Sequence, residues 1–500
     1  MKAKIWIAVW LAIVIASFSL ISSVVYKTDP FFHYHKPYTD RYFYALDNER
    51  SQNDGISKHF DYDTIITGTS MTENFRTTEA DKLFGGNSIK VAYSGGSYRE
   101  INDNIVRALK ANPNVKTVIR CLDMDRFGEP VDKMRNELGT YPTYLYDNNP
   151  FNDLNYVFNR EILFGRTYQM ILEKEKEDFV PGITSFDDYE RWQERYVFGI
   201  HTVSPEGLRI QKAEEELHLS EEDRKNIEKN IEMNVTSVAK QFPDVDFYYF
   251  YAPYSIAWWN SRWNDGKIYW QLEAEKYTTE LILPYENIHL FSFNNRTDIT
   301  TDLNNYKDKM HYGSWINSIM LRWMHDGTYR LTYDNYEEYC RQEQEFYTGF
   351  DYESINGQTD YEADFYAGAL LNNELTGAEP LDVLHDDSIQ IHLNKAEYIW
   401  DQEYIGAKFQ VDLDKGYKYL CFNGRKIQDH GRLTVYVYNE SGELVSRKET
   451  NYTELDNEMH QYTMDLSGIN GVVTVILNGG YVDSTGSADS DYQFSDIWVY

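Results

Sequence analysis

The chain has 500 residues, of which 42% are hydrophobic and 16% are aromatic, and its formal net charge is −32. This length exceeds one ordinary core and predicts two or three domains, while the hydrophobic fraction excludes a disordered chain. The negative charge, spread along the sequence without a basic tract, argues against nucleic acid or anionic lipid heads as partners.

An uncharged apolar stretch, Ile5–Tyr26, follows Lys2 and Lys4. About twenty such residues are needed to cross the hydrocarbon core of a membrane. A cleavable signal peptide has a shorter apolar core and a small-residue exit, so an uncleaved anchor over residues 1–30 is favoured over a signal peptide. The lysines before the span place the N-terminus in the cytoplasm and the bulk of the chain outside, as in a single-pass bacterial membrane protein.

Residues 31–345 alternate between strand-like and helix-like apolar patterns, which predicts an α/β domain with a parallel sheet between helices. A capping box at Ser97 and Glu100 begins one helix. Further helices are expected from about Ser220, over roughly Tyr269–Ile282 and after Gly313. The expected strands are Thr64–Thr67, Ser88–Ala92, Lys116–Leu122, Asp246–Tyr251 and Ile288–Phe293.

Small residues end the first two expected strands. The first strand runs through the letters GTS into Ser70, and the second ends in YSGGSYRE, where Gly95 and Gly96 precede the capped helix. Glycines let a backbone N–H approach a substrate, and a helix N-terminus adds positive potential, so this turn suits an oxyanion. A glycine-rich turn without a ligand is the alternative interpretation.

Asp308 and His311 come after the last expected strand. A nucleophilic serine needs a base within hydrogen-bond reach, and the base needs an acid that holds its tautomer. Because the carboxyl ends of parallel strands meet at one edge of a sheet, Ser70 is expected to lie near this pair. The pattern predicts a Ser-His-Asp triad.

These sequence blocks resemble the SGNH (GDSL-like) hydrolases over roughly residues 60–325. The resemblance implies a flavodoxin-like, five-stranded parallel sheet of the SGNH type. It implies Ser70 as nucleophile, His311 as base and Asp308 as the acid that orients it. The amide of Ser70, with that of Gly95 or Gly96, would form the oxyanion hole, and no cofactor is required.

The chain departs from the family pattern in two blocks. The serine block reads GTS instead of GDS, and the asparagine of the third block has no counterpart, since Asp123 and Asp125 stand in RCLDMDRF at that strand end. Loss of one oxyanion donor costs about a hundred- to a thousandfold in rate, so backbone donors could sustain a slower catalyst. This looser pattern is similar to membrane-anchored SGNH-like proteins, including the D-alanine transfer protein of teichoic acids and alginate O-acetylation proteins.

Three regions lie outside the triad blocks. An insertion at about 128–198, rich in Tyr, Phe and Asp, is expected to cover the site and help select an acceptor, or to be a helical excursion without substrate contact. Residues 346–379 are largely acidic, show no regular apolar pattern and contain Gly and Asn, which predicts a linker. Residues 380–500 alternate apolar and polar residues between turn signals, which predicts an antiparallel β-sandwich of the jelly-roll type. Such sandwiches are often carbohydrate-binding modules, and candidate sugar-stacking residues here are Tyr398, Trp400 and Tyr404; a purely structural or protein-contact role is the alternative.

No metal site is expected, because Cys121, Cys340 and Cys421 are far apart and show no metal-ligand spacing, and we expect buried thiols instead. The leading functional hypothesis is an extracytoplasmic serine esterase or O-acyltransferase that acts on acyl groups of a cell-surface polysaccharide. A membrane-bound acyl donor is a candidate partner. The alternative is a non-catalytic protein that binds envelope glycan on the same scaffold.

Overall fold

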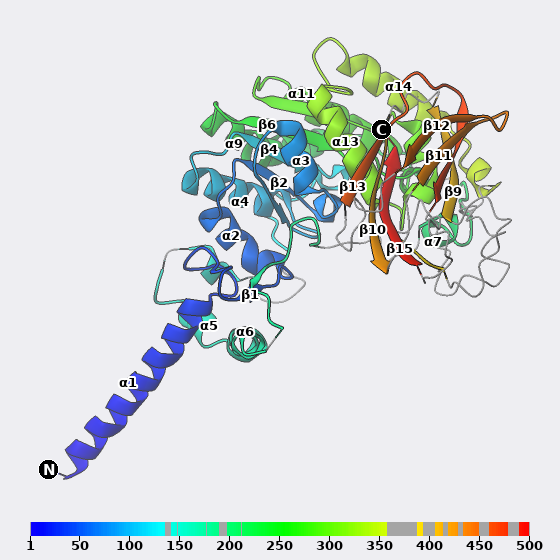
Figure 1. Ribbon diagram of the computed structural model, residues 1–500. Coiled ribbons are helices and arrows are strands. Elements are labelled where there is room, and N and C mark those ends of the chain that lie inside the picture. Colours follow the sequence, from blue (N-terminus) through cyan, green and yellow to red (C-terminus); the bar gives the residue numbers. More distant parts are fainter. Residues whose placement is uncertain are drawn as a thin grey trace, which may run out of the picture.

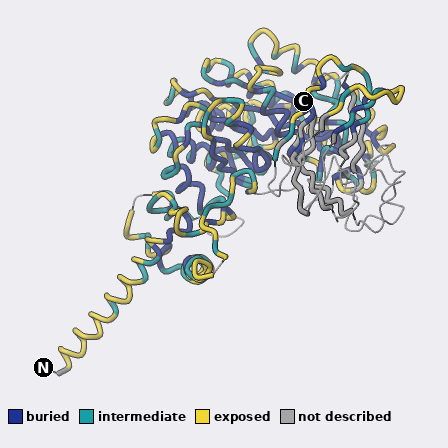
Figure 2. Tube along the Cα trace, viewed as in Figure 1, coloured by how far each residue is buried: buried dark blue, intermediate teal, exposed yellow. Residues whose placement is uncertain are grey.

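The computed structural model describes residues 2–135, 142–147, 149–176, 178–189, 198–211, 213–357, 388–393, 406–413, 419–428, 434–449, 460–478 and 490–499. A long helix, α1 (Lys2–Thr28), projects from an α/β body, and antiparallel strands follow that body (Figure 1). Within the described ranges α1 alone is long and apolar enough to cross a membrane. Its surface is exposed along most of its length (Figure 2), which fits a single-pass membrane anchor or a signal sequence.

Five parallel strands form the central sheet in the order β3-β2-β4-β6-β7, and all five expected strands are confirmed. The connection after β2 leads to β3 on one side, whereas the connections after β4 and β6 lead to the other side, so the direction of winding reverses between β2 and β4. Such a reversal opens a crevice outside the strand ends, where α/β proteins bind ligands. The strands are β2 (Thr64–Gly68), β3 (Ser88–Ala92), β4 (Thr117–Cys121), β6 (Asp246–Tyr251) and β7 (Ile288–Ser292).

Helices cover this sheet, and their ends follow local capping chemistry. Ser97 and Glu100 form the expected capping box of α4, in which the Ser97 N–H donates to the Glu100 carboxylate over 3.0 Å. Helix α2 packs on α4, α3 on α13, and α11 on α8 and α14. The helices are α2 (Glu49–His59), α3 (Thr77–Phe84), α4 (Tyr98–Ala111), α7 (Ile200–Val203), α8 (Glu221–Ile231), α9 (Ser237–Gln241), α10 (Ile256–Asn264), α11 (Ile268–Ile282), α12 (Thr297–Thr300), α13 (Ser314–Asp326) and α14 (Tyr336–Gly349).

The α/β body extends past the expected start of the linker at residue 346. Helix α14 continues to Gly349, and a 3-10 turn covers Tyr352–Gly357. Tyr347 is fully buried, stacks on Trp259 with ring centroids 4.1 Å apart, and donates its hydroxyl to the Asn294 carbonyl. This stretch belongs to the α/β body because its aromatic side chains pack into the core. Its acidic composition gave no sign of this packing.

The insertion divides between two places. Its middle part forms α5 (Leu154–Val157), a π-helix (Glu161–Thr167) and α6 (Tyr168–Lys174), which lie beside the end of α1 (Figure 1). A two-residue strand, β5 (Gly182–Ile183), then pairs in parallel with β1 (Phe43–Tyr44). The start of the insertion lies elsewhere: its residues Lys133 and Arg135 are beside the Gly95 turn.

The C-terminal region consists of two four-stranded antiparallel sheets, with strand orders β13-β10-β15-β8 and β12-β11-β14-β9. Alternate residues such as Val435 and Val437 are buried, as the period-two pattern requires. Tyr398, Trp400 and Tyr404 lie outside the described residues. The strands are β8 (Ser388–Leu393), β9 (Gly406–Asp412), β10 (Tyr419–Gln428), β11 (Thr434–Asn439), β12 (Leu444–Glu449), β13 (His460–Asp465), β14 (Val472–Asn478) and β15 (Ser490–Val499).

A pair of buried carboxyl groups, Glu275 on α11 and Glu343 on α14, joins these helices. Burial raises the pKa of Glu275 to about 7, although hydrogen bonds from Glu343, Ser292 and Asn294 favour its charged form. Burial, and then the charge of Glu275, raise the pKa of Glu343 well above its usual range. The pair therefore holds a proton at neutral pH, which Glu343 donates to Glu275.

Glu343→Gln should reduce the loss of stability on going to alkaline pH. Both folded pKa values exceed the unfolded value of 4.5, so the folded protein loses stability as the pH rises from about 4.5 through 7. Glutamine keeps a hydrogen-bond donor toward Glu275 without an acid to ionise. The expected gain at pH 8 is on the order of 1–3 kcal/mol, measured by thermal unfolding across pH. Glu337→Gln on the exposed side of α14 is the control, and equal pH slopes in all three proteins would contradict the proton assignment.

Candidate active site

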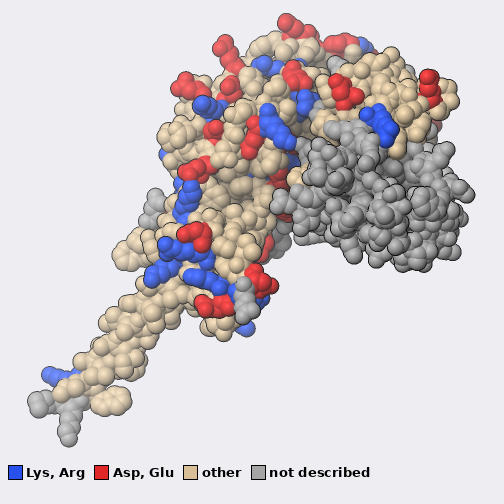
Figure 3. Space-filling model, viewed as in Figure 1, with Lys and Arg blue, Asp and Glu red and all other residues tan. Residues whose placement is uncertain are grey.

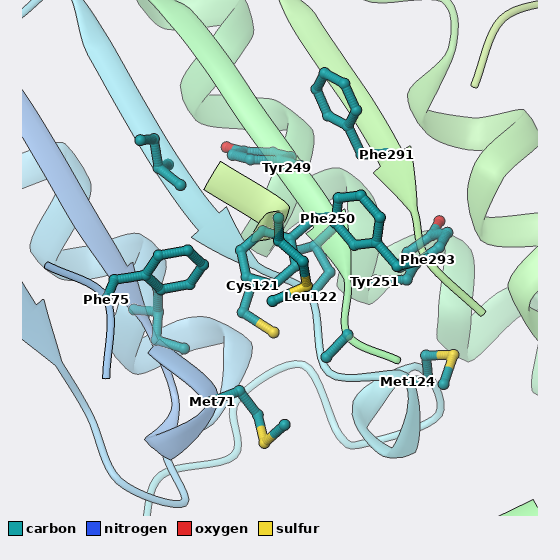
Figure 4. Close-up of a cluster of buried hydrophobic side chains, with 14 of the residues drawn as sticks. Met71, Phe75, Cys121, Leu122, Met124, Tyr249, Phe250, Tyr251, Phe291 and Phe293 are labelled. Carbon is teal, nitrogen blue, oxygen red and sulfur yellow. The ribbon is translucent and has the colours of Figure 1, made fainter. Parts of the chain in front are cut away.

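Ser70 stands at the carboxyl end of β2, where close packing fixes the backbone. A Cβ on Gly68 would lie 2.9 Å from Cβ of Cys121, so only glycine fits beside β4 at this point. Ser70 then opens a 3-10 turn, Ser70–Thr72. The next side chain, Met71, is buried in the apolar cluster at the strand ends, together with Phe75 (Figure 4). The Ser70 backbone is thus held by the core while its side chain remains partly exposed.

The structure brings Ser70, His311 and Asp308 together in one hydrogen-bonded chain. Ser70 Oγ lies 2.9 Å from His311 Nε2, and His311 Nδ1 lies 2.7 Å from Asp308 Oδ2. Both distances are within the reach that proton transfer requires. With the Nδ1 proton donated to Asp308, Nε2 accepts from the Ser70 hydroxyl, which is the arrangement of a serine nucleophile and its base.

Asp308 is held as a carboxylate. Burial would raise its pKa, but the hydrogen bond and charge of His311 and the N–H groups of Met310 and His311 outweigh burial and lower it to about 2. The loop itself is fixed from outside, since the Ser255 hydroxyl donates to the Lys309 carbonyl over 2.7 Å. Asp308 therefore remains charged at neutral pH and keeps the imidazole oriented.

Asp123 is buried next to the serine turn, where its carboxylate is occupied by hydrogen bonds from neighbouring residues. Its carboxylate accepts hydroxyl hydrogen bonds from Thr69 over 2.8 Å and from Tyr254 over 2.7 Å, and its backbone carbonyl accepts the Tyr98 hydroxyl. A carboxylate accepts hydrogen bonds and cannot donate them. Asp123 therefore positions the residue before Ser70 and does not replace the side-chain donor of an oxyanion hole.

The three expected oxyanion donors differ in their availability. The Gly96 N–H already donates to the Tyr93 carbonyl over 2.6 Å, so it is engaged within the turn. The N–H groups of Ser70 and Gly95 have no acceptor among the residues that the structure describes. Gly95 has φ +59°, a left-handed conformation that favours glycine. Ser70 and Gly95 remain the candidate donors.

A cationic cavity of about 280 Å³ lies beside Gly95. The guanidinium of Arg135 donates to the Ser94 carbonyl, so Arg135 both contacts the Gly95 turn and lines the cavity. Three cationic side chains line it, of which Arg126 also pairs with Asp125 over 3.5 Å and with Glu129 over 3.9 Å; an excess of cations favours an anionic group, in contrast to the net charge of the whole chain. The cavity is lined by Gly95, Ser97, Arg126, Lys133 and Arg135.

Two supporting contacts carry no sequence signal. The Asn317 amide of α13 donates to the Met71 carbonyl over 3.1 Å, which ties the helix after His311 to the serine turn. Glu49 accepts from the Ser94 N–H over 2.6 Å and hydrogen-bonds Glu73, so an acid pair bridges the serine and glycine turns. These residues lie too far apart in the sequence for spacing to join them. No group of three potential metal-ligating side chains occurs in the described part of the chain.

Comparison with known proteins gives no family assignment, since no family model and no curated protein matches the chain. Among solved structures, a Streptococcus pneumonia protein provisionally described as a platelet activating factor is 12% identical, over 55% of this chain and 89% of its own, with a TM-score of 0.28. A CBM4 structure is 15% identical over 22% of this chain and 69% of its own, with a TM-score of 0.18. A Bacillus subtilis glycoside hydrolase family 43 arabinoxylan arabinofuranohydrolase is 15% identical over 23% and 19%, with a TM-score of 0.14.

Asp308→Asn should leave the fold intact and impair proton transfer at Ser70. The amide would donate to His311 Nδ1 and favour the tautomer whose Nε2 carries the proton, which removes the acceptor from Ser70. A loss of about a thousand- to ten-thousandfold in kcat is expected, by analogy with the same change in serine proteases. Hydrolysis of a small acyl ester measures it, with Asp326→Asn at the exposed end of α13 as control. Wild-type turnover in Asp308→Asn would show that Asp308 is not the acid that orients His311.

Proposed function

We propose that the chain is a membrane-anchored serine esterase or O-acyltransferase of the SGNH type, acting on acyl groups of a cell-surface polysaccharide. The observation that carries this proposal is the hydrogen-bonded chain of Ser70, His311 and Asp308 at the carboxyl edge of the sheet. The strand order is that of flavodoxin-like sheets, which supports the SGNH-type fold.

In the proposed reaction Ser70 Oγ attacks the acyl carbonyl carbon while His311 Nε2 takes the hydroxyl proton. The oxyanion faces the N–H groups of Ser70 and Gly95. Collapse of the tetrahedral intermediate releases the alcohol, which receives the proton from His311 and leaves an acyl-Ser70 ester. Water or a sugar hydroxyl, deprotonated by His311, then takes the acyl group and regenerates the serine.

The location and substrate class follow from features around this site. Helix α1 as an uncleaved anchor, with Lys2 and Lys4 in the cytoplasm, would hold the α/β body outside a bacterial membrane, where surface polymers are acylated. The cationic cavity beside Gly95 suits a polymer with anionic groups. The C-terminal region, proposed to be a jelly-roll sandwich, offers a second surface for glycan.

Ser70→Ala should abolish labelling by a fluorophosphonate probe, because the probe reacts with an activated serine. Ester hydrolysis should fall by at least about a thousandfold, as when the nucleophile of a triad is removed. Ser237→Ala on α9, whose hydroxyl donates to the Met233 carbonyl, is the matched control and should label as wild type does. Equal labelling of wild type and Ser70→Ala, or labelling of neither, would favour the non-catalytic glycan-binding alternative.

Hydrolysis and transfer are separated by product analysis. A small acyl ester is supplied with and without a sugar acceptor, and the acylated sugar and the free acid are quantified. Acylated sugar formed by wild type and not by Ser70→Ala would establish transfer through the acyl-enzyme. Free acid as the sole product would assign the protein as an esterase.

A further inference from the structure

Large apolar side chains are exposed on the part of the insertion that we call the foot, residues 151–174. Exposed aromatic and aliphatic residues in one contiguous region usually mark an interaction surface. The foot comprises a short turn, α5, the π-helix and α6, and it lies beside α1 (Figure 1). Its exposed large hydrophobic side chains are Phe151 at 86%, Phe164 at 63%, Leu154 at 59%, Tyr168 at 51% and Leu172 at 44%.

The foot packs directly against the apolar helix α1. The Phe18 and Phe158 rings lie 4.6 Å apart, and Val25 is fully buried in a cluster with Tyr156. Next to this cluster, the hydroxyls of Thr28 and Thr167 share a hydrogen bond of 3.0 Å. The foot thus contacts α1 from its last turn down to Phe18.

This contact places the foot at the depth of the membrane. Phe18 stands eight residues before Tyr26, the end of the apolar run, which corresponds to about 12 Å along a helix. If the membrane surface lay at Phe18 instead, the span would keep thirteen residues, Ile5–Ser17, or about 20 Å. A hydrocarbon core is about 30 Å thick, so α1 cannot span it and leave Phe18 outside.

We propose that the foot is a second membrane element, inserted beside α1 in the outer half of the bilayer, where lipid acyl chains cover its exposed apolar side chains. This inference rests on the proposed role of α1 as an uncleaved anchor and is independent of the chemistry at Ser70. The foot does not span the membrane; it lies in the boundary between head groups and acyl chains, as amphipathic segments do.

Two charged residues of the foot make ionic contacts at its junction with the body, and at the proposed depth the exposed carboxylates of Glu161 and Glu173 would lie at the level of the head groups. Arg166 pairs with Asp47 over 2.6 Å, and His33 contacts Asp153 over 3.1 Å, both where α1 enters the body. Figure 3 shows Lys, Arg, Asp and Glu side chains gathered at this junction, above the apolar length of α1. Arg160 is exposed at the turn after α5, and its long side chain can bury its stem and carry the guanidinium to the head groups.

Depth-dependent quenching tests the insertion in the full-length protein. A Cys421→Ser background leaves Cys121 and Cys340, which are buried, and single cysteines at Phe164 or Leu154 then receive an environment-sensitive fluorophore. The protein is placed in lipid nanodiscs that contain phospholipid spin-labelled on the acyl chain. Leu20→Cys in α1 is the positive control, and Tyr333→Cys, 63% exposed on the body, is the negative control.

Fluorescence at positions 164 and 154 should fall at least about twofold with the acyl-chain quencher, as it does at position 20, while position 333 should stay unchanged. Quenching at position 20 without quenching at 164 and 154 would overturn the inference and leave the anchor intact. Absence of quenching at position 20 would overturn the anchor itself, and the inference with it. Either result is independent of labelling at Ser70.

Discussion

The hydrogen bonds to the carboxylate of Asp123 are the interactions on which the candidate active site depends. It accepts hydrogen bonds from the hydroxyls of Thr69, directly before Ser70, and of Tyr254, three residues after β6, and Asp123 itself lies two residues after β4. Three strand ends are thereby tied to one buried charge. Removing a partner from a buried carboxylate is costly, so these strand ends cannot move independently. This constraint fixes the position of the serine turn relative to the ends of β4 and β6.

The sequence predicted the elements whose signals are local. The five strands have short apolar runs, the Ser97 capping box has its fixed spacing, and Asp308 and His311 share one loop. The placement of Ser70 near His311 followed from the rule that parallel strands end at one edge. Each of these depends on nearby residues or on a single topological rule, so no three-dimensional information was needed.

The remaining features depend on pairs that are distant in sequence. Glu275 and Glu343 would each be expected on an exposed helix face, and only the packing of α11 against α14 buries them together. From the sequence, the N–H groups of Gly95 and Gly96 were equal candidates for an oxyanion donor. The structure separates them, because the Gly96 N–H donates to the Tyr93 carbonyl. Similarly, the insertion was expected to cover the site or to form a helical excursion, and its composition did not show that Phe158 would contact Phe18.

The exit of α1 into the body is a rigid joint. Val25 and Thr28 are buried, and the Asp29 carboxylate immediately afterwards accepts the N–H groups of Tyr34 and His35. A flexible tether would let a catalytic domain search a hemisphere around its anchor, but this joint allows no such search. If α1 is an uncleaved anchor, as proposed, Ser70 would lie at a constant height and in a constant orientation above the lipid surface. Under the proposed function, lateral diffusion of the protein would then set its encounters with a polysaccharide, and only the polymer segment that passes at that height would be within reach.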